Sequence, residues 1–163
     1  MSPAHIHLLI THLPIFGSFI GSLVLVYAII VKSNETKIAA YGVLILSTFG
    51  AGISYLTGEG AEEVVEEIPG VVESAIETHE NFALIAFIGL IILGFLSLLG
   101  LISILKKSRH ANNIAIVVLI AAITSFGLIA ITGYLGGKIR HTELASNHSN
   151  KTNLLESTLD FQL

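Results

Sequence analysis

The chain has 163 residues, of which 53% are hydrophobic and 12% charged, with a formal net charge of −4 and no cysteine. A soluble domain of this length carries about a quarter charged residues, so the composition excludes an ordinary soluble enzyme. It predicts an integral membrane protein of one domain. Without cysteine, disulfides, thiolate metal sites and a covalently attached c-type haem are excluded.

Four long apolar runs predict membrane spans at about residues 7–31, 38–58, 79–105 and 111–137. Each run has roughly the ~20 residues that cross a hydrocarbon core. In lipid a segment must satisfy its own backbone hydrogen bonds, so the runs are expected to be helices. We predict an all-α, four-helix up-down bundle over residues 1–141 and a polar tail at 142–163. Pro14 is expected to kink or restart the first helix.

The two short connections carry five of the eight lysines and arginines. By the positive-inside rule these connections face the cytoplasm. Both termini are then expected outside (N-out/C-out), which makes the chain a multi-pass protein of the inner membrane if its source is a Gram-negative bacterium. The basic residues are Lys32, Lys37, Lys106, Lys107 and Arg109.

The middle connection, residues 59–80, contains eight glutamates. Its apolar positions recur at helical spacing, which predicts a short acidic amphipathic helix on the membrane surface between spans two and three. We expect this helix to break at Pro69-Gly70 and a second helix to start near Pro69 and run into the third span. The acidic residues are either a solvated helix face or a docking surface for a basic electron-transfer partner.

Histidines gather where the predicted topology places the outer face. His5, His7 and His12 open the first span, His79 opens the third, and His141 follows the fourth. Ionisable groups beside a span are costly and indicate function. In an up-down bundle, spans one and three lie diagonally and run parallel, so their imidazoles can face each other across a cofactor. A b-type haem requires two such nitrogens on opposite sides of the iron.

The pairing of ligands stays open at this level. Thr11-His12 and Thr78-His79 form a faint internal repeat, which makes His12 and His79 the first axial pair. Helix lengths measured back from the inner ends instead place His79 level with His7 or His5. His7 and His141 are the alternatives: each could replace a member of this pair or bind a second metal site.

Two further residues are candidates for the cofactor pocket. Phe16 lies one turn after His12 and could wall a porphyrin, and Gly17 could make room for it. A copper or zinc site built from the histidines is the alternative, although no HExxH or cysteine spacing accompanies them.

The opening His7-Leu-Leu-Ile-Thr-His12-Leu-Pro14-Ile resembles that of the DUF2231 family of small bacterial membrane proteins. The histidine before span three and the Gly136-Gly137-Lys138-Ile139 closure before His141 are also similar. The resemblance implies a four-helix, haem-associated membrane protein that takes part in electron transfer. This chain differs in having Leu8 where that family has proline, and in a shorter closing motif.

Together these features predict a membrane-bound b-type haem protein that carries single electrons near the outer face. It would act as an electron carrier or redox-complex subunit rather than a stand-alone enzyme. Its partners would be the bilayer, a quinone or membrane redox complex, and a soluble outer protein, with homo-oligomerisation left open and no nucleic acid. The alternative is a non-redox accessory subunit or a copper- or zinc-binding membrane protein.

Overall fold

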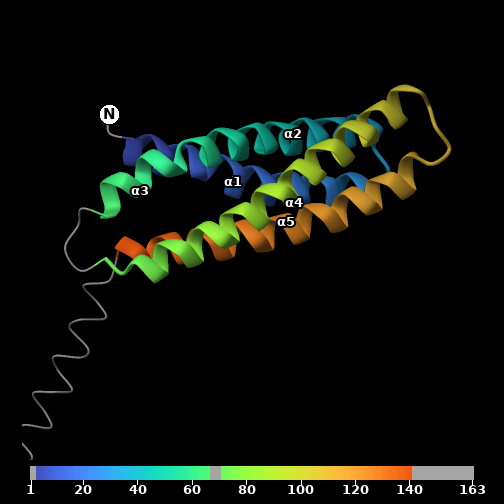
Figure 1. The fold of residues 1–163 in the computed structure, drawn as a ribbon. Coiled ribbons are helices and arrows are strands. Elements are labelled where there is room, and N and C mark those ends of the chain that lie inside the picture. The colour runs from blue at the N-terminus through green and yellow to red at the C-terminus, as the bar shows by residue number, and fades with distance from the viewer. Residues whose placement is uncertain (1–2, 67–70, 141–163) are drawn as a thin grey trace, which may run out of the picture.

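Five helices make up the residues that the computed structural model describes, 3–66 and 71–140 (Figure 1). Four of them are long and apolar enough to cross a membrane, which confirms the all-α membrane prediction. A fifth, short and acidic, occupies the connection where a surface helix is predicted. The helices are α1 (Pro3–Ile30), α2 (Asn34–Leu56), α3 (Gly58–Glu66), α4 (Glu73–Leu105) and α5 (Ala111–Arg140).

Helix α1 continues through Pro14 without a break, so the prediction that a helix restarts there is wrong. The Pro14 carbonyl accepts hydrogen bonds from Ser18 Oγ at 2.6 Å and from Ser47 Oγ of α2 at 3.0 Å. These bonds hold the proline turn against the neighbouring helix. The predicted break at Pro69-Gly70 and the tail after residue 141 lie outside the described residues, and α4 begins at Glu73.

The long helices pack in a square arrangement. Helix α1 packs against α2 and α5, and α4 packs against the same two helices, so α1 and α4 occupy opposite corners. Helix α3 packs mainly on α1. The starts of α1 and α4, helix α3 and the end of α5 lie at one end of the molecule, which we call the histidine end (Figure 1). Both short turns lie at the other end.

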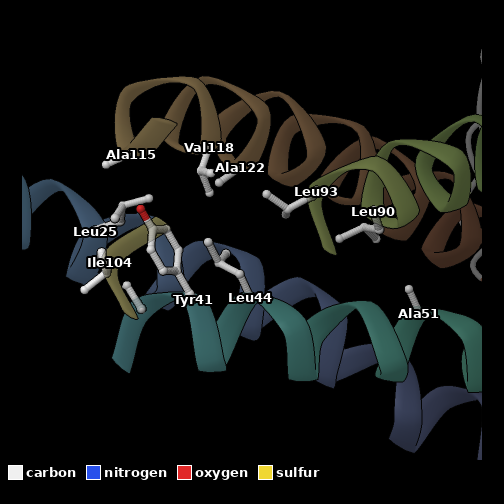
Figure 2. Close-up of a cluster of buried hydrophobic side chains, with 11 residues drawn as sticks. Leu25, Tyr41, Leu44, Ala51, Leu90, Leu93, Ile104, Ala115, Val118 and Ala122 are labelled. Carbon is white, nitrogen blue, oxygen red and sulfur yellow. The ribbon is translucent and has the colours of Figure 1, made fainter. Parts of the chain in front are cut away.

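All four long helices contribute side chains to the core, as Figure 2 shows. Lipid tails are as apolar as this core, so the helices associate through close packing rather than through burial from water. Glycines make that packing close. At four of them a Cβ atom would come within 2.6–2.8 Å of a side chain on the neighbouring helix: Gly21, Gly50, Gly94 and Gly100.

Candidate functional site

His7 on α1 is a half-buried imidazole fixed by the end of α2. Its Nδ1 lies 3.0 Å from the carbonyl oxygen of Ser54 and 3.3 Å from Thr57 Oγ1. A carbonyl oxygen only accepts, so Nδ1 carries the proton and donates it. In the neutral imidazole the other ring nitrogen, Nε2, is then an acceptor with a free lone pair.

His79 on α4 is held in the same way by α5. Its Nδ1 donates to the carbonyl oxygen of Thr132 at 3.0 Å. This bond also selects the tautomer in which Nε2 is unprotonated. Histidines that ligate a metal almost always donate their second ring N–H to a carbonyl or carboxylate, because this orients the ring and raises its basicity. Both imidazoles therefore have the hydrogen bonding of metal ligands.

The two imidazoles are close enough to interact electrostatically. They come from α1 and α4, the helices at opposite corners of the square. Neither ring is fully exposed or fully buried. The structure thus brings together one histidine from each helical hairpin at the histidine end.

The two hairpins hold their histidines with equivalent residues. The first set is Ser47 and Ser54 of α2 with Gly58 at the start of α3, and the second is Ser125, Thr132 and Gly136 of α5, with the same spacing. The first serine of each set bonds to a carbonyl of the partner helix, Pro14 in one hairpin and Gly89 in the other. The second residue accepts from the histidine, and the glycine lies against the ring.

The glycines allow the rings to lie close to the helix backbone. A Cβ on Gly58 would lie 3.8 Å from His7 Cε1, an ordinary contact. A Cβ on Gly136 would lie 3.0 Å from His79 Cε1 and 3.3 Å from Nδ1, closer than side-chain carbons normally approach. The His79 side of the site therefore depends on glycine more strongly than the His7 side.

The predicted first pair, His12 with His79, is not the pair that the structure brings together. His12 lies on the exposed side of α1, where its Nδ1 donates to the Leu8 carbonyl of its own helix at 2.7 Å. Its ring stacks on Phe16, which is 55% exposed, with centroids 6.1 Å apart. Phe16 therefore belongs to the outward face of α1 rather than to the His7–His79 site.

The remaining predicted residues lie elsewhere. Gly17 is buried, and a Cβ there would meet Ser47 at 2.9 Å, so this glycine serves the packing of α1 on α2. His5 is exposed near the start of α1. His141 lies outside the described residues.

A pair of carboxyl groups lies beside the site. Glu62 on α3 forms a side-chain hydrogen bond with Glu80, the residue after His79. This hydrogen bond, together with partial desolvation and the charge of Glu80, raises the pKa of Glu62 above its ordinary value. The bond joins α3, which packs on α1, to α4. No sequence pattern indicated this contact, because the two residues belong to different helices.

The donor set decides which metal centre the described residues fit. Within residues 3–66 and 71–140, no group of three or more His, Cys, Asp or Glu side chains is arranged to hold a metal ion. A zinc site takes three or four protein ligands. A haem brings four nitrogens of its own and needs only two axial imidazoles. The two Nε2 atoms of His7 and His79 match the two axial ligands of a haem better than they match the ligand set of a zinc ion.

No family model, curated protein or solved structure matches the chain. The resemblance to the DUF2231 family therefore stays a prediction.

Proposed function

We propose that this protein binds a b-type haem through His7 and His79 and carries single electrons in a bacterial inner membrane. One observation supports this most directly. Both imidazoles donate Nδ1–H to a helix carbonyl, which leaves both Nε2 atoms as acceptors at one end of the bundle. Two separate hairpins select the same tautomer, as a pair of axial ligands would require.

The bundle would tune the haem through these contacts. A haem supplies a one-electron couple, and its potential depends on axial ligands, their hydrogen bonds and burial. The Ser54 and Thr132 carbonyls make the imidazoles more basic, which stabilises the oxidised, more positively charged state. The half-buried setting opposes this by disfavouring added charge. The residues themselves bind, orient and set the potential, without covalent chemistry.

The proposed topology is an up-down bundle with both termini outside. The basic turns would then face the cytoplasm and the histidine end the outer face. The acidic helix α3 would lie beside the haem on that side, with Glu59, Glu63 and Glu66 exposed. A basic soluble redox protein would be attracted there by complementary charge. A quinone or membrane complex would exchange electrons from within the bilayer.

An optical titration of the full-length protein with hemin tests the proposal. The wild type should give a low-spin Soret band that sharpens and shifts on dithionite reduction. His7→Ala and His79→Ala should each lose the low-spin spectrum, whereas His12→Ala should keep it. Loss in His12→Ala with retention in His7→Ala would establish the other pairing. A wild-type protein that gives no low-spin band would overturn the haem function.

A second variant separates ligation from folding. The Ser54 carbonyl lies in the last turn of α2, and losing the His7 donor removes one of its hydrogen bonds. Glutamine at position 7 can still donate to this carbonyl but offers no imidazole. His7→Gln should therefore unfold like the wild type yet fail to form the low-spin species. Parallel metal analysis would reveal copper or zinc if the alternative centre were present.

A further inference from the structure

The two short turns at the opposite end of the bundle have the same backbone structure. At the first, Ser33 N–H donates to the Ala28 carbonyl and Lys32 N–H to the Ile29 carbonyl. At the second, Ser108 N–H donates to Ser103 and Lys107 N–H to Ile104. Both are Schellman motifs, in which the residue after the helix cap takes a left-handed conformation. That residue is a lysine each time.

Lysine is an unfavourable residue at this position. Lys32 has a φ of 54° and Lys107 a φ of 51°, where a Cβ atom crowds the backbone. Glycine adopts this conformation freely and is the usual residue in the motif. Strain kept at two equivalent positions indicates that the side chains have a use. The shared property of the two side chains is their positive charge.

The surrounding segments are strongly basic. Lys32, Lys106, Lys107 and Arg109 are all exposed, and we call them the basic face. Glu35 is the one acidic residue in the sequence segments 31–37 and 105–112. A further cation, Lys37, is 2% exposed and bonds to Asn112 Oδ1 at 2.6 Å. This contact ties the start of α2 to the start of α5, so the two turns lie side by side.

We propose that the basic face binds the headgroups of anionic phospholipids. The charges begin where the apolar surface ends: Ile30 is 71% exposed and Leu105 65% exposed, directly before the two turns. A helix side that faces lipid tails places the residues after it at headgroup level. Lysines near a membrane surface attract anionic lipids. This proposal does not depend on haem binding at the histidine end.

The test compares lipids added to the full-length protein in a neutral detergent. Phosphatidylglycerol should raise the midpoint of thermal unfolding, whereas phosphatidylcholine or inorganic phosphate should not. The effect should disappear in about 1 M salt, where charges are screened beyond ~3 Å. Lys32→Asn and Lys107→Asn keep residues that tolerate a positive φ. Each should weaken phosphatidylglycerol binding about fivefold, and the double variant about 25-fold.

Two controls make the result decisive. Lys138→Gln removes the same charge at the histidine end and should leave the lipid response unchanged. Without phosphatidylglycerol the double variant should unfold at the wild-type midpoint or higher, because the strained lysines are gone. Full phosphatidylglycerol affinity in the double variant, an equal response to phosphatidylcholine, or an equal response to inorganic phosphate would each overturn the proposal.

Discussion

Two adjacent glycines of α5 give a matched test of the candidate site. Gly136 lies against the His79 ring, and a Cβ there would come within 3.0 Å of Cε1. A Cβ on Gly137 would meet no atom within 4 Å. Both lie in the same helix, so Gly136→Ala and Gly137→Ala gain the same helix propensity. The two variants differ only in what the new methyl group does to His79.

The energies predict different outcomes for the two variants. Alanine is about 1 kcal/mol more favourable than glycine in a helix, so Gly137→Ala should raise the thermal midpoint by about 2–4 °C. In Gly136→Ala the His79 ring must shift by a few tenths of an ångström, which strains a hydrogen bond to Thr132 that is worth about 0.5–1.5 kcal/mol. The two terms nearly cancel, so Gly136→Ala should unfold close to the wild type.

Hemin affinity should also differ between Gly136→Ala and Gly137→Ala. Loss of the hydrogen bond that orients a ligating histidine typically weakens metal binding about 10–100-fold. Hemin titration followed by absorbance should show this weakening in Gly136→Ala and not in Gly137→Ala. NMR of the histidine ring nitrogens, without any haem, should show a changed His79 Nδ1–H signal only in Gly136→Ala. Equal hemin affinities and unchanged His79 signals in both variants would refute the assigned role of Gly136.

Three further predictions concern packing and protonation. A Cβ on Gly100 would lie 2.6 Å from Tyr41 Cζ, so Gly100→Ala should lower the free energy of unfolding by about 1–3 kcal/mol. A Cβ on Gly42 would meet no atom within 4 Å, so Gly42→Ala should not lower it. Thermal unfolding of the two variants measures both effects. The Tyr41 hydroxyl is buried without a hydrogen-bond partner among the described residues. Tyr41→Phe should therefore raise the free energy of unfolding, measured by denaturant titration, by about 1–3 kcal/mol. A destabilised variant would contradict this. The pKa of Glu62 is raised, so its hydrogen bond to Glu80 stabilises the packing of α3 at low pH and is lost as the pH rises through that pKa. Hydrogen exchange of the α3 amides, corrected for intrinsic rates, should therefore be faster at about pH 8 than at about pH 5. The variant Glu62→Gln should remove this pH dependence.

Composition and periodicity were sufficient to predict the helices. Uncharged runs of membrane length leave the backbone no alternative to helix, and this holds for α1, α2, α4 and α5. Three of the predicted spans start later than their helices, because the apolar run stops at the first polar residues, whereas the fourth starts with α5 at Ala111. Helix α4 begins at Glu73 and α1 at Pro3, since polar residues at a membrane surface can remain helical.

Which histidine of the first span lies near His79 could be predicted only in part from the sequence. His7 and His12 lie about 140° apart on a helix, so one of them faces the bundle only if the other does not. The Thr-His repeat favoured His12, and helix length favoured His7 or His5. Length agrees with the geometry because α1 and α4 end in the same Schellman motif, at Ile30 and Leu105. Counted back along each helix from these ends, the positions of His7 and His79 differ by only three residues.

The real equivalence of the hairpins lies in their second helices. The Tyr-Leu-x-Gly motifs at residues 55–58 and 134–137 are out of register with it by one residue, because Gly58 corresponds to Gly136. The spacing of Ser47, Ser54 and Gly58 relative to their counterparts carries it. Serine and glycine are common in membrane helices for packing alone, so this pattern has no distinct signal in one sequence. The hydrogen bonds from the histidines to Ser54 and Thr132 distinguish it from ordinary packing.

The two nitrogens of each imidazole allow the structural and functional roles to be separated. Nδ1 serves the fold, since it links each histidine to a carbonyl of the neighbouring helix. A histidine needed only for this purpose could be replaced by glutamine at either position. Nε2 contributes nothing to those bonds. A low-spin haem spectrum that glutamine fails to restore at both His7 and His79 would therefore identify Nε2 as the atom that binds the iron.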